Sequence, residues 1–381
     1  MQYDVITFDT QTVERNAFHF DGGFLSQLKQ FKDGPVHVVV SEIVVREIFK
    51  HLVEKTRAAR DSALAAHKKA VDHGLAKADA PFVPDEVDIK TVARSRLDNF
   101  LTEIGAEIVR ASNVPMSDLV ESYFQPSPPF SAAGKNKAEF PDAIALLSLE
   151  RWANEKHLKV LGVSQDKGWN AYAELKEWID LRQELPDALS LLQKHSEEAR
   201  AVVRQLLAAI GDNSDSQLTT RFESLFASEV SGYDVYGEAD SFYTAEADQV
   251  ELDLVEFRFV GDDEDLEFSV IQSGPNMLVA EIEIEASIRA ETTFYMSIYD
   301  SIDKDYTPVG SSTTRAEEEL AFKILATFER GEAMARFDVS KIEIVNGPSS
   351  INFGSVEPDY EPEPEEHYEM PHNLPYDEIP I

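Results

Sequence analysis

The chain reads VHVVVSEIVVREIFKHL over residues 36–52, and this stretch sets the fold class. Its first five residues are mostly β-branched and do not alternate with polar ones, which is typical of a strand buried on both faces of a parallel sheet. Ser41 has a side chain suited to cap the helix that follows. That helix begins at Glu42 and continues, rich in Ala, Lys and Arg, to about residue 78, a length that predicts a helical hairpin or arm.

Strands and helices alternate on both sides of this stretch. Short apolar strand patterns lie at residues 3–8, 107–112 and 158–164. Helical patterns lie at residues 16–31, 90–103, 142–154, 169–181 and 186–210. Pro141 is expected near the first helical position of the segment that starts at residue 142. This alternation predicts an α/β N-terminal domain with a central parallel sheet flanked by helices.

Beyond residue 230 the hydrophobic period changes to two, which indicates half-exposed antiparallel strands. The expected strands are residues 250–260, 277–288, 292–299, 320–328 and 333–345. After them, Pro and acidic residues alternate in a segment too poor in apolar side chains to fold alone. We therefore expect three parts, an α/β domain over 1–230, an acidic, mainly antiparallel β domain over 231–350, and a flexible acidic, Pro-rich tail over 351–381.

Composition excludes several classes of site. The chain is 43% hydrophobic, enough for real cores, and it has no cysteine. Disulfides, zinc sites built on thiolates and cysteine nucleophiles are therefore excluded. The first residues carry no basic leader pattern, and no window of the sequence approaches eighteen uninterrupted apolar residues. We expect a soluble, cytoplasmic protein without a membrane partner.

The net charge of −36 is unfavourable for binding a phosphate backbone. Most of this charge lies in the C-terminal part, because residues 231–381 hold 8 Lys and Arg against 36 Asp and Glu. Residues 1–230 hold 27 against 35. A mildly acidic domain can still bind nucleic acid where its carboxylates surround metal ions, so the charge does not exclude a nuclease.

Four acidic residues stand at comparable places along the α/β pattern. Asp9 and Asp166 follow predicted strands, Glu47 lies in the first turns of a helix after a strand, and Asp142 starts a helix. Taken singly, each is more simply a turn, capping or solvated residue. Because the carboxyl ends of parallel strands meet at one edge of a sheet, we expect the four to converge. Clustered carboxylates of this kind are suited to hold Mg²⁺ or Mn²⁺.

Four motifs, taken in order and spacing, resemble a bacterial PIN-like nuclease subfamily with an EFPDA-type motif, over about residues 1–180. They are FDT at 8–10, SEIVVREIFKHL at 41–52, KAEFPDAIALLSL at 137–149 and VLGVSQDKGW at 160–169. The resemblance implies a PIN-like fold with Asp9, Glu47, Asp142 and Asp166 as metal-site acids and catalytic residues. It adds Ser164, Glu139 and Thr10 as accessory residues. Gly168 departs from the family, which often has an acid there, so a second metal site is not carried over.

The resemblance implies a Mg²⁺- or Mn²⁺-dependent nuclease that hydrolyses phosphodiester bonds, with RNA favoured over DNA and an endoribonuclease expected. Nucleases with this domain occur as toxins of toxin–antitoxin pairs or as antiphage defence effectors. Candidate phosphate contacts are Lys135, Asn136, Lys137 and Lys167. The histidines His19, His51 and His67 have no metal-ligand spacing and are interpreted as structural. The acidic C-terminal region is a candidate site for a regulatory protein partner.

Two other classes compete with this interpretation, and the sequence disfavours the first. FDTQT at 8–12 approaches the start of an aspartyl phosphatase, but Gln11 stands where the second Asp is needed. A catalytically silent PIN-like binding or scaffold protein, whose acidic β domain recruits partners, is the stronger alternative, and Gly168 favours it. Retention of all four acids argues against it, because a cluster of carboxylates is costly to keep without a cation.

Overall fold

A computed structural model of the chain describes residues 3–77, 88–125, 127–130, 136–193, 197–261, 266–301, 304–330 and 336–359, with backbone alone for 136–138. The chain divides into two compact units. The first comprises Met1–Glu229, Arg258–Glu285 and Phe322–Asn346. The second comprises Val230–Phe257, Ala286–Ala321 and Gly347–Ile381. Each of the two units is made of several chain segments. The expectation that 1–230, 231–350 and 351–381 are separate domains stays a prediction.

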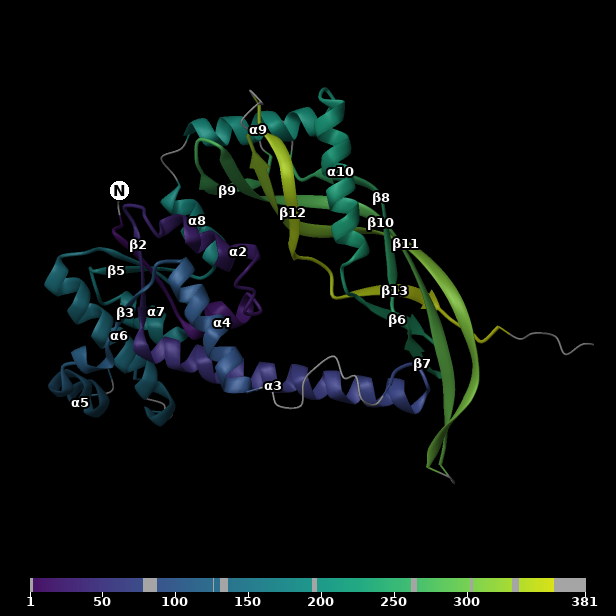
Figure 1. Ribbon diagram of the computed structural model, residues 1–381, viewed down its shortest axis with the longest axis horizontal. Coiled ribbons are helices and arrows are strands. Elements are labelled where there is room, and N and C mark those ends of the chain that lie inside the picture. Colours follow the sequence, from purple (N-terminus) through teal and green to yellow (C-terminus); the bar gives the residue numbers. More distant parts are fainter. Residues whose placement is uncertain are drawn as a thin grey trace, which may run out of the picture. The chain divides into compact units, whose positions relative to one another are not determined.

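The first unit is built on a five-stranded parallel sheet in the order β3-β2-β1-β4-β5 (Figure 1). The strands are β1 (Val5–Phe8), β2 (His37–Ser41), β3 (Glu107–Val109), β4 (Val160–Val163) and β5 (Ile179–Arg182). All four residues of β1 and of β4 are buried, as their apolar runs predicted. The α/β class with a parallel core and flanking helices is confirmed.

Helices surround this sheet and continue beyond it. They are α1 (Thr10–Arg15), α2 (Gly23–Ser26), η1 (Gln27–Phe31), α3 (Glu42–Asp72), α4 (Ile89–Glu103), η2 (Ala111–Asn113), α5 (Met116–Phe124), α6 (Asn136–Lys156), α7 (Lys167–Ala173), α8 (Leu185–Leu192), α9 (Glu197–Gly211) and α10 (Ser216–Ser231). Ser41 caps α3 by accepting a hydrogen bond from the Ile43 backbone N–H, as the sequence indicated. The long helix is therefore confirmed, and Figure 1 shows it as the extended purple element.

Three local predictions were wrong. The expected helix 169–181 ends at Ala173, and its last part is β5, whose Leu181 side chain packs against Gly162 of β4 so closely that a Cβ at 162 would lie 2.4 Å away. The expected helix 16–31 is interrupted, because Ala17 and Phe18 adopt left-handed backbone conformations with φ of 51° and 56°. Pro141 lies inside α6, which begins five residues earlier than its predicted first turn.

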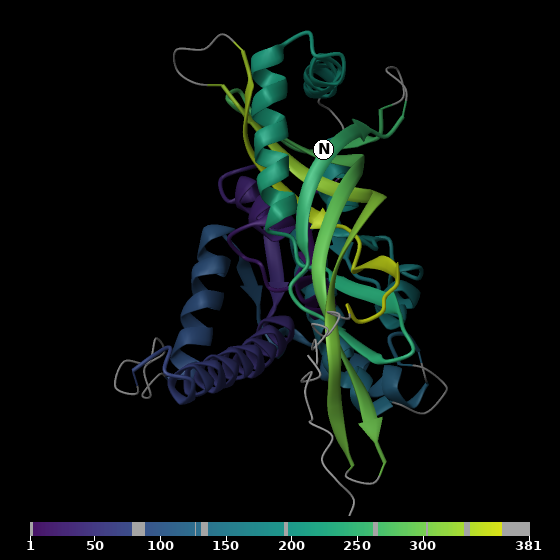
Figure 2. The same ribbon diagram turned by 90° about the vertical axis from the view of Figure 1, so that its right-hand side faces the viewer.

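Of the remaining strands in the described residues, six form a mainly antiparallel sheet, as expected, and two form a separate parallel pair. They are β6 (Tyr236–Asp240), β7 (Thr244–Ala247), β8 (Glu251–Phe259), β9 (Phe268–Ser273), β10 (Met277–Asp300), β11 (Asp305–Glu329), β12 (Asp338–Asn346) and β13 (Ser350–Ser355). The order is β12-β11-β10-β7, with β8 and β9 also paired to β10, and both views show β10 and β11 side by side (Figure 2).

Two strand predictions need correction. The expected strands 277–288 and 292–299 are one continuous strand, because alternating buried side chains continue through residues 289–291. The expected tail at 351–381 begins with β13, which pairs in parallel with β6 and buries Ile351 and Phe353. Residues 360–381 of that tail lie outside the described part of the chain.

The hydrophobic core of the first unit joins the two kinds of sheet. Buried residues of the parallel sheet and its helices form one cluster with Ile271 of β9, Val279 of β10 and Leu325 of β11. Within this unit, β9 also packs against α8 and α9. The first unit is therefore more than the nuclease-like α/β fold, because it includes one end of the antiparallel sheet.

Candidate functional site

The four predicted acids line a single cleft of about 280 Å³ in the first unit. Asp9 ends β1 and caps α1, and Asp166 follows β4 and caps α7. Glu47 lies in the second turn of α3, and Asp142 in the second turn of α6. The parallel strand order places β1 and β4 side by side, so their carboxyl ends bring Asp9 and Asp166 to one edge.

Asp9 is held by hydrogen bonds on both carboxylate oxygens. Oδ1 accepts from the backbone N–H and the hydroxyl of Thr12, both at 2.7 Å. Oδ2 accepts from the Ser164 hydroxyl at 2.5 Å, and the Ser164 hydroxyl accepts from the backbone N–H of Asp166 at 3.0 Å. Because Asp9 is only 4% exposed, these bonds keep a buried carboxylate in one orientation.

Trp169 links the other two aspartates. Oδ1 of Asp166 accepts from the backbone N–H groups of Gly168 at 2.7 Å and Trp169 at 3.0 Å. The indole N–H of Trp169 donates to Oδ1 of Asp142 at 2.9 Å. Among the described residues, no donor contacts Oδ2 of Asp142 or Oδ2 of Asp166. One oxygen of each aspartate is therefore fixed and the other is left for a ligand.

Glu47 is oriented by the residue that follows Asp9. Its Oε2 accepts a hydrogen bond from the Thr10 hydroxyl at 2.8 Å, and both side chains line the cleft. Thr10 is the first residue of α1, so the turn that places Asp9 also places this donor. The two acids on the β1 and α3 sides of the cleft are thereby positioned together.

The electrostatics indicate that the acids act on one another. Burial and, to a smaller extent, the charges of Asp166, Glu47 and Asp9 raise the pKa of Asp142 to about 6, against the hydrogen bond from Trp169. Burial also raises the pKa of Asp9, although the bonds from Ser164 and Thr12 oppose the shift. Such a cluster is unfavourable unless protons or cations neutralise it.

The donor set fits a hard divalent cation. The acids offer oxygen atoms alone, which Mg²⁺ and Mn²⁺ prefer. In the described ranges, no three His, Asp or Glu side chains are already drawn together at the spacing of a bound ion. The Oδ2 atoms of Asp142 and Asp166 accept no hydrogen bond there, so they are the oxygens that a cation would take.

Gly168 lies where the family often has an acid, and packing accounts for the difference. A Cβ at this position would lie 2.9 Å from Oδ1 of Asp166 and 3.2 Å from the carbonyl oxygen of Pro129. The segment before α6 therefore covers the place that a side chain would take. The described site has the four principal acids and no room for a fifth at Gly168.

Replacing Gly168 with Asp is expected to destabilise the protein by about 1–3 kcal/mol without increasing metal affinity, because the new side chain overpacks against Pro129. Chemical denaturation and Mn²⁺ titration measure the two effects. Gly34→Asp is a matched control, because a Cβ at Gly34 would make only ordinary contacts, the nearest at 3.5 Å, and Gly34 does not have a positive φ. A Gly168→Asp protein that is as stable as wild type and binds Mn²⁺ more tightly would contradict this account.

The accessory predictions have mixed placements. Ser164 and Thr10 reach the acids, whereas Glu139 lies on α6 three residues before Asp142 and is not among the residues that line the cleft. Lys167 is exposed at the start of α7 and does not line the cleft either. Lys135 and the side chains of Asn136 and Lys137 lie outside the described part of the chain.

Several residues of the site were not assigned to it from the sequence. Thr12 holds Asp9, Trp169 holds Asp142, and Glu14 and His51 line the cleft. Thr12 could have been found from the sequence, because Asp9 and Thr12 have the spacing of a helix cap and its third residue. His51 could also have been found, because it is one helical turn after Glu47. The contact of Trp169 with Asp142 spans 27 residues and has no local signature.

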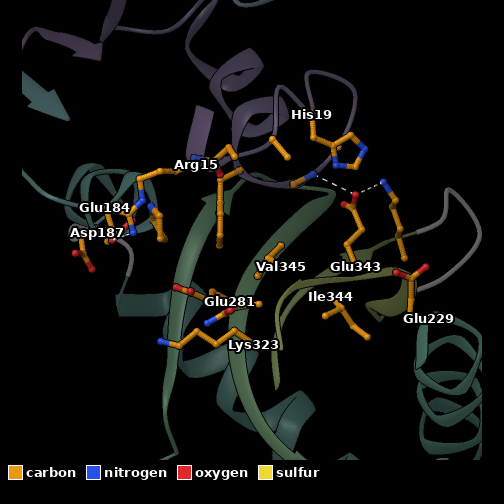
Figure 3. A pocket seen from close by; sticks show the side chains of 18 residues that line it. Arg15, His19, Glu184, Asp187, Glu229, Glu281, Lys323, Glu343, Ile344 and Val345 are labelled. Atoms are coloured by element: carbon orange, nitrogen blue, oxygen red, sulfur yellow. Dashed lines mark hydrogen bonds and ion pairs between the residues drawn. The ribbon is translucent and has the colours of Figure 1, made fainter. Parts of the chain in front are cut away.

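A larger cleft in the same unit has a different character (Figure 3). It measures about 820 Å³ and is lined by residues of the α1–α2 segment, α8 and strands β10 to β12. Most of its charges are neutralised in pairs, with Arg15 to Glu184 at 2.8 Å and Lys341 to Glu343 at 3.0 Å. Burial raises the pKa of Glu281 to about 7. Size therefore does not select the chemical site, and we assign it to the smaller cleft with the four acids.

Comparison with known proteins finds a family for one segment of the chain. A family model described as PIN domain matches residues 6–169. Residues 6–169 form a PIN domain. The matched segment contains all four acids and ends at Trp169. No curated protein and no solved structure matches the chain.

PIN domains are a family of nucleases that generally depend on divalent metal ions, and a nuclease domain implies a nucleic-acid substrate. The four acids that line the smaller cleft lie within the matched segment. None of the helices in the described ranges has the length and apolar character needed to cross a membrane.

Proposed function

We propose that the PIN domain is a Mg²⁺- or Mn²⁺-dependent endoribonuclease that hydrolyses phosphodiester bonds. The observation that supports this most strongly is the convergence of Asp9, Glu47, Asp142 and Asp166 on one cleft, where burial and the neighbouring carboxylates raise the pKa of Asp142. A cleft of this kind is stabilised by cations, and cations attract phosphate. The preference for RNA and a role as a toxin or antiphage effector rest on the family resemblance.

In this mechanism, Asp9, Asp142 and Asp166 would hold the cation, and Glu47 would complete the site or orient the attacking water. A bound Mg²⁺ or Mn²⁺ supplies polarisation of the phosphate and a lower pKa for water. Ser164 and Thr12 keep Asp9 ionised and oriented, since both donate to its carboxylate. Attack proceeds in line on phosphorus, without a covalent bond between enzyme and substrate.

Glu47 is suited to orient water because its other contacts are few. Thr10 donates to Oε2, and among the described residues no donor contacts Oε1. Trp169 in turn fixes Asp142 by its indole N–H. These bonds are made before substrate binds, so the chain contributes a prearranged set of acceptors.

The substrate class is tested by incubating the protein with matched RNA, single-stranded DNA and double-stranded DNA, each with Mg²⁺, with Mn²⁺ and with EDTA. The proposal expects metal-dependent internal cuts in RNA that exceed those in DNA. Equal or greater cutting of DNA would overturn the RNA preference and leave the nuclease. Loss of nucleotides from one end alone would overturn the endonucleolytic mode.

The pH dependence of cleavage follows from Asp142. Its pKa is raised to about 6, so its carboxyl must lose a proton before it binds a cation. At Mn²⁺ concentrations below saturation, the cleavage rate is expected to rise as the pH passes through about 6. Higher Mn²⁺ should shift this rise to lower pH, because the cation competes with the proton. If the pH profile of the cleavage rate does not shift with Mn²⁺ concentration, proton loss from Asp142 is not linked to metal binding and the prediction is wrong.

A second candidate function is a catalytically silent PIN domain that serves as a scaffold. The observation that favours it is Gly168, where an acid is common in the family and packing leaves no space. The two functions differ in one readout, since a silent scaffold binds without cutting in Mg²⁺ and in Mn²⁺. Cleavage abolished by Asp9→Asn excludes the scaffold.

We also propose that the second unit recruits a regulatory protein with a Lys- and Arg-rich surface. Its described residues carry sixteen Asp and Glu against three Lys and Arg, so they repel nucleic acid and attract cations. Tyr295 is 56% exposed and lies in register with Glu246 on the neighbouring strand, which pairs an aromatic face with an acid. Such pairs are suited to bind Lys and Arg side chains.

This partner proposal is tested with the substitution Glu246→Lys combined with Tyr295→Ser, on the solvent face of the sheet. Binding of a Lys-rich peptide, measured by fluorescence anisotropy, is expected to weaken and to lose part of its salt dependence. Deletion of residues 357–381 tests the tail separately. Unchanged activity and unchanged peptide binding after that deletion exclude a role for the tail.

A further inference from the structure

His51 occupies an unusual place for a basic side chain. It lines the acid cleft one helical turn after Glu47 on α3. Among the described residues that line this cleft, the other charged side chains are all Asp or Glu. An imidazole there faces the space in which a phosphate would approach the bound cation.

The orientation of His51 is set by Glu14. Nδ1 of His51 lies 3.1 Å from Oε1 of Glu14, which comes from α1 and also lines the cleft. A second carboxylate, Glu54 of α3, is 3.8 Å from the same nitrogen. The contact engages Nδ1, so Nε2 on the opposite side of the ring is the nitrogen left for a ligand. The side chain is 35% exposed, which is compatible with access from the cleft.

We propose that His51 is a catalytic residue that contacts the substrate, donating from Nε2–H to a phosphate oxygen while Glu14 holds Nδ1–H. This inference rests on the proposed nuclease function and adds a residue outside the four acids. The ring then lies between two anions, with Glu14 at Nδ1 and the phosphate at Nε2. The charged groups that face it are Glu14 from α1 and Glu47 and Glu54 from α3.

A hydrogen-bond donor at His51 would help the cleft to bind a phosphate, because the other ionisable side chains that line it in the described residues are acidic. A cation held by the acids neutralises part of the charge, but a polyanionic strand extends beyond it. A donor one turn along α3 from Glu47 would contact a phosphate oxygen next to the cation. A hydrogen bond between charged groups is stronger than a neutral one, so its loss should be measurable in substrate affinity.

The test compares wild type with His51→Gln, Glu14→Gln and the double variant. His73→Gln is the matched control, because His73 is an exposed residue at the end of the same helix and does not line the cleft. For His51→Gln we expect kcat/KM to fall by about tenfold or more. Glu14→Gln should cause a smaller loss, and the double variant should lose little more than His51→Gln alone.

Binding is measured separately, with a labelled oligonucleotide in Ca²⁺ in place of Mg²⁺. His51→Gln should weaken this binding by about tenfold. The same variant should keep wild-type thermal stability and the same stabilisation by Mn²⁺, because His51 is not assigned to the cation. A His51→Gln variant that loses its response to Mn²⁺ would overturn the assignment in favour of a metal ligand.

Failure of this inference is distinct from failure of the proposed function. If wild type cleaves, Asp9→Asn does not, and His51→Gln matches wild type in KM, kcat and oligonucleotide affinity, the nuclease stands and the role of His51 is overturned. If wild type neither cleaves nor binds the oligonucleotide, the nuclease proposal fails and the role of His51 fails with it.

Discussion

Replacing Asp142 with Asn is expected to make the metal-free protein more stable at neutral pH while it abolishes cleavage. Burial and three neighbouring carboxylates raise the pKa of Asp142 from 3.8 to about 6. The folded protein thus binds this proton more tightly than the unfolded chain, so wild-type stability falls as the pH rises from about 4 to about 6. Above that range the deficit is constant at about 3 kcal/mol, and Asn removes it.

Urea denaturation in EDTA at two pH values measures this effect. At about pH 4 wild type and Asp142→Asn should differ little, whereas at about pH 7 the variant should be the more stable. With Mn²⁺ the order should reverse, because wild type gains stability from the bound ion. Asp98→Asn on the exposed face of α4 serves as a control that should change neither result. If Asp142→Asn is destabilised in EDTA at neutral pH, the carboxylates do not repel one another as described.

Replacing Ser164 with Ala is expected to lower the cleavage rate by about 10- to 100-fold. The hydroxyl donates to Oδ2 of Asp9 and accepts from the backbone N–H of Asp166, so one side chain orients two acids. Its loss leaves a buried carboxylate with one fewer donor, and the pKa of Asp9 should rise further. Weaker binding of Mn²⁺ and a steeper dependence of activity on Mn²⁺ should accompany the slower rate.

Ser148→Ala is the matched control for this variant. Ser148 is as fully buried as Ser164, but its hydroxyl donates to the Ala145 carbonyl within α6 and contacts none of the acids. Its substitution should leave Mn²⁺ affinity and cleavage unchanged. Equal effects of the two substitutions would show that the loss at Ser164 reflects packing and not the orientation of Asp9.

The features that sequence could predict are those set by short-range pattern. Continuous apolar runs predicted β1, β2 and β4, and the rule that parallel strands end at one edge placed Asp9 and Asp166 together. The residues WIDLR gave no strand signal, because β5 is recognisable mainly through the packing of Leu181 on Gly162.

The parts that could not be predicted depend on contacts between distant residues. Nothing local to Gly168 indicates that Pro129 occupies the space beside it. Nor does the sequence around Trp169 indicate that its indole reaches Asp142. His51 was interpreted as structural because it lacks metal-ligand spacing. The role proposed for it depends on its contact with Glu14 of α1, which the sequence does not indicate. The acids were accessible from the sequence, and the side chains that hold them were accessible only in part.

The most direct test of the central claim is cleavage of labelled RNA by wild type, Asp9→Asn and Asp142→Asn, with Mg²⁺ or Mn²⁺ and with EDTA. We expect wild type to cut in the presence of either metal and not in EDTA, and we expect both variants to be inactive while they stay folded. Cleavage by wild type that persists in EDTA, or by a folded Asp9→Asn or Asp142→Asn protein at the wild-type rate, would contradict the assignment of the acid cleft as the active site.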